Sequence, residues 1–206
     1  MVRAATALLV LSALACSGKS PQRAAAAADT ARPEGPPAEK VDSILPMAEY
    51  LRRFRSGLSE TARLEGGTLD RETLARQFLA GVAGQDTAAL IRLVVSPAEF
   101  AWLLFPQHKY SEPPNQLDPA LFWSRLDAES EQGLRSVLQR YGGHTLGFRE
   151  LRCQRDTLQL RAGSATLWSS CQISFRNEGK VERHRLFGSI VERDGRVKLL
   201  SLANEF

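Results

Sequence analysis

The spacing of the apolar residues in this 206-residue chain changes at Gly142-Gly143. Before these glycines, apolar residues recur every three or four positions, which is typical of one side of a helix. After them, apolar and polar residues alternate, which is typical of a strand. Helices followed by an antiparallel meander predict an α+β fold in which N-terminal helices pack on a curved sheet formed by the C-terminal half.

In the first half, helices are predicted wherever an apolar stripe follows a capping residue or proline and ends at glycine or proline. The strongest such signal is Ser96-Pro97-Ala98-Glu99, which has the composition of a capping box. Residues 107–117 form a polar loop before the longest helix. The predicted helices are 47–64, 70–84, 86–95, 99–105 and 118–141.

In the second half, turn residues such as Asp194-Gly195 separate the predicted strands. Strict alternation through 165–175 directs Cys171 toward the core and Trp168 toward the opposite, polar face. A tryptophan exposed on that face would indicate a contact surface for a partner or for another element of the chain. The predicted strands are 146–153, 157–161, 165–175, 182–192 and 197–203.

This order of elements resembles the cone-shaped fold of the nuclear transport factor 2-like superfamily, also called cystatin-like. The resemblance covers about residues 69–206 and rests on element order. That fold usually has a strand between its second and third long helices. This chain has the predicted helix 99–105 there, so either 102–105 is strand or the fold differs.

The resemblance implies a pocket between the sheet and the long helices. Related enzymes use an aspartate, a histidine or a tyrosine there as a general base, and the candidates here are Tyr110, Asp127 and His184. Alternation places His184 on the strand face of Leu186 and Ile190, pointing inward. A core histidine bonded to a backbone carbonyl is the favoured interpretation over catalysis.

Residues 1–15 have the pattern of a signal peptide, with Arg3 before a short apolar run. Ala13-Leu14-Ala15 fits ordinary signal-peptide cleavage, which would yield a secreted or periplasmic soluble protein. The same residues followed by Cys16 resemble the lipobox of bacterial lipoproteins, although Ala13 replaces the usual leucine. That resemblance implies that Cys16 carries lipid, including palmitate, and anchors the chain to a membrane of the cell envelope.

Residues 16–41 are rich in alanine, proline and glycine and are predicted to form a disordered tether. Residues 42–206 then form the single folded domain. If Cys16 is lipidated, Cys153 and Cys171 remain as a pair in an oxidising compartment, and we expect them to form a disulfide. The alternative is two small buried residues that never meet.

Composition argues against several classes of function. The net charge of +4 is small, and the only tight basic cluster, 52–55, lies on a predicted helix, so we expect no nucleic-acid partner. The three histidines have no metal-ligand spacing, and we expect neither a metal nor a cofactor. We expect an envelope lipoprotein that binds a small ligand or an envelope protein without catalysis. The alternatives are an envelope enzyme of isomerase, dehydratase or hydrolase type and a purely structural envelope component.

Overall fold

The structure is a computed structural model that describes residues 45–156, 160 and 165–206. The chain divides into two units, Met1–Asp42 and Ser43–Phe206, and all described residues belong to the second. The predicted signal peptide, Cys16 and the predicted tether therefore lie outside the described residues, as does most of the predicted strand 157–161.

The helices of the first half begin at the predicted capping residues. Asp70 and Asp86 accept the backbone N–H groups of Thr73 and Ala89, and the capping box of Ser96 and Glu99 is confirmed. The helices are α1 (Met47–Arg55), α2 (Arg71–Ala83), α3 (Thr87–Arg92), α4 (Pro97–Glu99) and α5 (Pro119–Tyr141).

Three predicted helices differ from the structure. The helix predicted for 86–95 ends at Arg92, because Val94 and Val95 pair with the strand residue Leu199 instead. The helix predicted for 47–64 ends at Arg55, and Gly57 follows with a φ of 84°, a conformation that stops a helix. The segment predicted as the helix 99–105 is a π-helix at Phe100–Leu104 followed by a 3₁₀ turn at Phe105–Gln107. Residues 102–105 are therefore helical, and the chain departs here from the cone-fold pattern.

The second half forms an antiparallel sheet, which confirms the α+β prediction. The strands are β1 (Leu146–Asp156), β2 (Thr166–Asn177), β3 (Lys180–His184), β4 (Ile190–Arg193) and β5 (Arg196–Leu199). They are arranged in the order β1-β2-β4-β5, and β3 also pairs with β2. The prediction of one strand over 182–192 is wrong, because residues 185–189 leave the ladder between β3 and β4.

The predicted pairing of the cysteines is confirmed, since a disulfide joins Cys153 of β1 to Cys171 of β2. Cys171 is buried, as its alternation predicted. Near the disulfide, β2 contains a bulge at Ser170, which has a φ of 49°, and the pairing with β1 shifts there. The extra residue reverses the alternation, so Trp168 packs against the same apolar cluster as Cys171, whereas Leu167 belongs to a second cluster.

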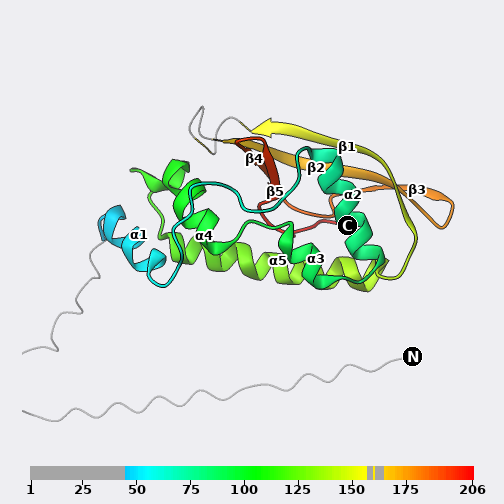
Figure 1. Ribbon diagram of the computed structural model, residues 1–206, viewed down its shortest axis with the longest axis horizontal. Coiled ribbons are helices and arrows are strands. Elements are labelled where there is room, and N and C mark those ends of the chain that lie inside the picture. The colour runs from blue at the N-terminus through cyan, green and yellow to red at the C-terminus, as the bar shows by residue number, and fades with distance from the viewer. Residues whose placement is uncertain (1–44, 157–159, 161–164) are drawn as a thin grey trace, which may run out of the picture. The chain divides into compact units, whose positions relative to one another are not determined.

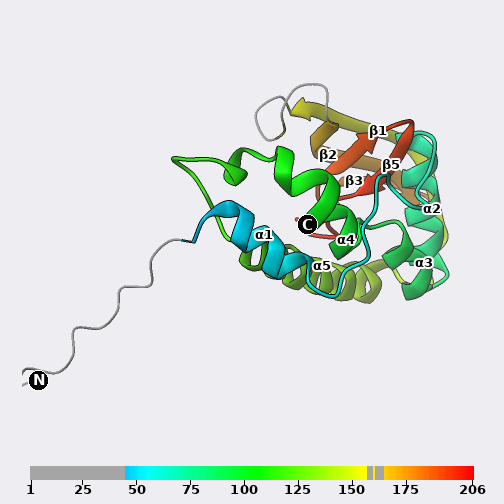
Figure 2. The same cartoon turned by 60° about the vertical axis from the view of Figure 1, so that its left-hand side comes forward.

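The helices and the sheet form layers (Figure 1). The long helix α5 runs along the side of the domain opposite β1 and β2, and α2 packs against the sheet. Figure 2 shows α1 beside α5. The residues after β5 leave the sheet and cross α5, where Asn204 Nδ2 donates to the Gly133 carbonyl at 2.7 Å. For this reason the strand predicted for 197–203 ends at Leu199.

Candidate functional site

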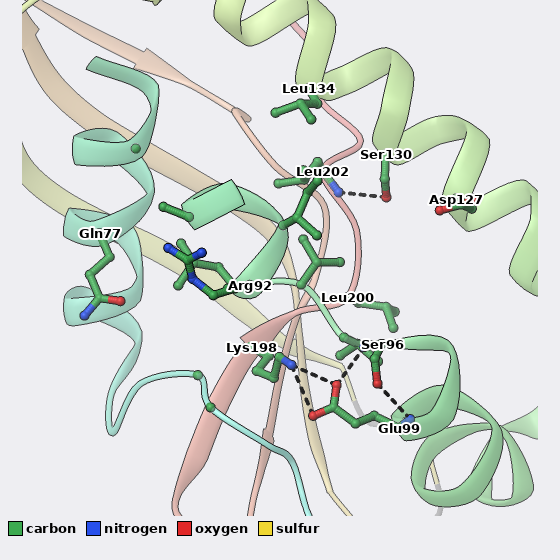
Figure 3. A pocket seen from close by; sticks show the side chains of 18 of the residues that line it. Gln77, Arg92, Ser96, Glu99, Asp127, Ser130, Leu134, Lys198, Leu200 and Leu202 are labelled. Carbon is green, nitrogen blue, oxygen red and sulfur yellow. Dashed lines mark hydrogen bonds and ion pairs between the residues drawn. The ribbon is translucent and has the colours of Figure 1, made fainter. Parts of the chain in front are cut away.

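A groove of about 1270 Å³ lies among the described residues. Its walls come from α2, from residues 86–97 and from α5, and the residues around Lys198 to Leu202 form its floor. Figure 3 shows Asp127, Ser130 and Leu134 of α5 on one side, Gln77 of α2 on the other, and Arg92 between them. Its apolar lining residues include Ile91, Val94, Leu126, Leu134, Leu200 and Leu202.

A buried ion pair lies at one end of the floor (Figure 3). Lys198 is 4% exposed and Glu99 is 1% exposed, and the Lys198 Nζ donates to the two Glu99 carboxylate oxygens at 2.8 and 3.1 Å. The same ammonium donates to the Glu65 carbonyl at 3.1 Å. Since an ammonium has three N–H donors, every donor of Lys198 is used.

The Glu99 carboxylate is equally well bonded. It accepts the backbone N–H groups of Ser96 and Glu65, each at 2.6 Å, in addition to the Lys198 ammonium. The pair therefore ties α4, β5 and the segment at Glu65 together. Neither charge has a free donor or lone pair to offer a substrate, which indicates a structural role.

The border of the groove carries more acidic than basic side chains. The exposed acidic residues of its lining include Glu65, Asp127 and Glu131. Among the described residues that line the groove, Arg92 is the exposed basic one. Asp127, Glu65 and Arg92 make no ion pair with the described part of the chain, and Glu131 approaches Arg135 only at 3.6 Å. The carboxylates of this border are thus available to a ligand.

The structure brings one of the three predicted general-base candidates to the groove. Asp127 lines it, whereas the Tyr110 ring packs at an angle against the rings of His108 and Phe122, at centroid distances of 4.9 and 5.9 Å. His184 lies at the end of β3. Within residues 45–156, 160 and 165–206, no hydrogen bond or ion pair joins any two of Tyr110, Asp127 and His184.

His184 takes part in a polar network instead. Its Nε2 lies 3.1 Å from the Glu182 carboxylate, so the predicted backbone-carbonyl partner is wrong. The same carboxylate accepts the Tyr141 hydroxyl at 2.9 Å and the Asn177 amide at 2.9 Å. These groups come from three elements: Asn177 from β2, Glu182 and His184 from the paired strand β3, and Tyr141 from the end of α5. The residue spacing within one strand could not reveal this arrangement.

This network changes the acidity of two groups. Hydrogen bonds, first from Asn177 and then from Tyr141 and His184, hold the pKa of Glu182 below its ordinary value. Burial, with the hydrogen bond to Glu182, raises the pKa of Tyr141 to about 12. Tyr141 is therefore a fixed hydrogen-bond donor near neutral pH.

Trp168 contacts another element of the same chain. The Arg71 guanidinium at the start of α2 lies 3.6 Å from the centre of its ring, and Trp168 Nε1 donates to Glu192 at 3.0 Å. The side chain is half-buried rather than exposed on a polar face. The sequence left open whether Trp168 contacts a partner or another element of the chain. The structure shows contacts within the chain, to Arg71 and Glu192.

Sequence reasoning missed most of the groove. It identified Asp127 and predicted Glu99 only as a helix cap. Lys198 carried a weak signal, because it stands between the apolar Val197 and Leu199 of a strand. Nothing in the local sequence links it to a glutamate on α4.

The described residues contain no group of three or more metal-ligating side chains that could hold a metal ion. None of the helices in that part of the chain is long and apolar enough to cross a membrane. Comparisons of the chain with protein-family models, with curated proteins and with solved structures found no match.

Proposed function

We propose that this protein is an envelope lipoprotein, anchored through Cys16, whose folded domain binds a segment of a partner protein in the groove and catalyses no reaction. The observation that carries the proposal is the groove itself, which is apolar, open and about 1270 Å³ in volume. Sites for drug-sized ligands typically measure about 300–1,000 Å³. A larger groove walled by two helices suits an apolar protein segment.

The chemistry of the groove supports binding over catalysis. A catalytic site needs a general base or nucleophile that can reach a substrate. The buried charges of Glu99 and Lys198 are fully bonded to each other and to backbone groups. Asp127 is exposed and has neither the histidine nor the tyrosine candidate beside it.

Location in the envelope is supported by the disulfide and by the N-terminal sequence. Disulfides persist in exported proteins and are rare in the reducing cytosol. The apolar run before Ala13-Leu14-Ala15-Cys16 resembles an export signal that ends at a lipidation site, with Ala13 in place of the usual leucine. Together these features favour an anchored domain that faces an oxidising compartment.

The cone-like architecture is part of the same proposal. The helices-then-sheet order supports it, and so does the position of α2 and α5 against the sheet. The helical segment 97–107 departs from it, because the superfamily has a strand at the corresponding place. The groove is bounded partly by this segment, so its shape is particular to this chain.

The groove can be tested with Nile red, an uncharged apolar dye. Ile91 is 56% exposed and lines the groove, so Ile91→Asp places a charge on the binding surface with little cost to the core. Leu121→Asp is the matched control, since Leu121 is 68% exposed on α5 outside the groove. The full chain carrying Cys16→Ser, taken from the soluble fraction, keeps lipid out of the assay.

We expect saturable Nile red binding that Ile91→Asp weakens by roughly tenfold, the equivalent of about 1.4 kcal/mol. Leu121→Asp should bind the dye as the parent chain does. Equal dye binding by all three proteins would show that the groove is not the apolar site and would contradict the proposal.

A further inference from the structure

The groove carries an ordered row of charges beside its apolar surface. On α5 its lining residues fall on one helical face, and they comprise Trp123, Leu126, Asp127, Ser130, Glu131 and Leu134. Asp127 and Glu131 are one turn apart, so their carboxylates follow the helix axis next to the apolar residues of the same face. Glu65 also lines this groove.

An extended peptide has no strand edge to join at the floor of the groove. The outer edge of β5 is already paired, since Val197 and Thr68 exchange backbone hydrogen bonds at 2.9 and 3.0 Å. Leu199 donates to the Leu93 carbonyl and accepts from the Val95 N–H, both at 2.8 Å. A partner must therefore bind through its side chains, as an amphipathic helix does when it docks in a groove.

We infer that the segment bound in this groove is an amphipathic helix with lysine or arginine residues along the edge of its apolar face. Two basic residues four positions apart on that helix would match the spacing of Asp127 and Glu131. The inference rests on the proposed function of the groove and adds the charge and conformation of its ligand. Arg92 lies between α2 and the α5 wall, away from this acidic row (Figure 3).

The test compares two synthetic 18-residue helical peptides. Both have leucine on one face, and the flanking positions are lysine in one peptide and glutamate in the other. Binding to the full Cys16→Ser chain is followed by fluorescence anisotropy at low and high salt. The net charge of +4 disfavours non-specific attraction of the lysine peptide, so a preference for that peptide would come from the groove.

We expect the lysine peptide to bind at least tenfold more tightly than the glutamate peptide at low salt, and the difference to shrink as salt screens the charges. Asp127→Asn with Glu131→Gln should weaken the binding of the lysine peptide about five- to tenfold. The matched control is Glu72→Gln with Glu129→Gln, which removes the same charge from α2 and α5 outside the groove lining. That control should bind as the parent chain does.

Equal affinity for the two peptides, or tighter binding of the glutamate peptide, would overturn the inference. So would an equal loss in the Glu72→Gln/Glu129→Gln control, which would reflect overall charge. If neither peptide binds while Nile red binding still depends on Ile91, the inference that the ligand is a basic amphipathic helix fails. The groove would still be the apolar binding site. If Ile91→Asp changes neither dye nor peptide binding, the proposed function itself fails.

Discussion

Lys198 and Glu99 show how single residues shape the groove. Burial of two charges is costly, and it is tolerated only where the geometry of the pair is good and the remaining donors and lone pairs are bonded. Here the pair satisfies both conditions, and it also bonds the N–H and the C=O of Glu65. The segment that borders the groove at Glu65 is therefore fixed to the sheet by side chains, which gives the binding surface a defined shape.

Tyr141 is a buried residue whose raised pKa links its ionisation to folding. In an unfolded chain a tyrosine has a pKa of about 10. In the folded protein, burial and the bond to Glu182 raise the pKa of Tyr141 to about 12. The folded state therefore holds this proton more tightly, and the resulting stability is fully present below about pH 10 and is lost as the pH rises to about 12.

We predict that Tyr141→Phe removes this alkaline dependence. Near neutral pH the variant should lose about 1 kcal/mol of unfolding free energy with its hydroxyl hydrogen bond. Between pH 10 and 12 the parent chain should lose on the order of 1–2 kcal/mol more than the variant does. Urea unfolding across pH 8–12 measures both effects, with Tyr50→Phe as the control. Parallel stability curves for the parent chain and Tyr141→Phe would contradict the assignment.

At the scale of elements, the contact between α5 and the C-terminal segment completes the groove. Leu202 donates its N–H to Ser130 Oγ at 3.1 Å, and Asn204 bonds the Gly133 carbonyl. A Cβ atom at Gly133 would overlap the Leu202 carbonyl oxygen, so only glycine allows this approach. Leu202 also lines the groove, which couples this contact to the binding surface.

Gly133→Ala is therefore expected to destabilise the domain, although alanine favours a helix by about 1 kcal/mol over glycine. The overlap with Leu202 should cost about 1–3 kcal/mol net and weaken Nile red binding by moving the groove floor. Ala128→Gly is the control, because Ala128 is exposed on α5 and the change affects only the helix propensity of the position. This variant should bind Nile red as the parent chain does. A Gly133→Ala chain that is more stable than the parent would show that this approach is not tight.

The same elements show what the sequence could and could not predict. Asp86 and the Ser96–Glu99 box mark helix starts correctly, because caps act within four residues. The break between β3 and β4 was missed, because it depends on distant contacts such as that between the Gly188 N–H and the Ser201 carbonyl. The bulge at Ser170 likewise leaves no trace in an alternating pattern. Of the groove, Asp127 was visible in sequence, whereas the link from Glu99 to Lys198 spans 99 residues.

At the scale of the whole molecule, the proposed function combines the described domain with a lipid anchor at the N-terminus. The disulfide closes a loop with a sequence separation of 18 residues, and on the chain-entropy estimate such a loop adds about 3 kcal/mol of stability in an oxidising compartment. The groove provides the binding surface on the same domain. A lipid on Cys16 would hold that surface at a membrane, where an amphipathic basic helix of an envelope partner could meet it.

Whether the thiol of Cys16 carries lipid distinguishes the anchored form of the protein from the soluble form. An acyl chain stabilises membrane association by about 0.8 kcal/mol for each buried CH₂, and two chains hold a protein stably where one does not. We therefore predict that the wild-type protein enters the detergent phase on phase separation and incorporates labelled palmitate. Cys16→Ser should do neither. Cys153→Ser with Cys171→Ser is the control for a general effect of cysteine loss, and it should still partition with detergent. Wild-type protein that stays in the aqueous phase would instead indicate ordinary cleavage after Ala15, and the groove would then belong to a soluble exported protein.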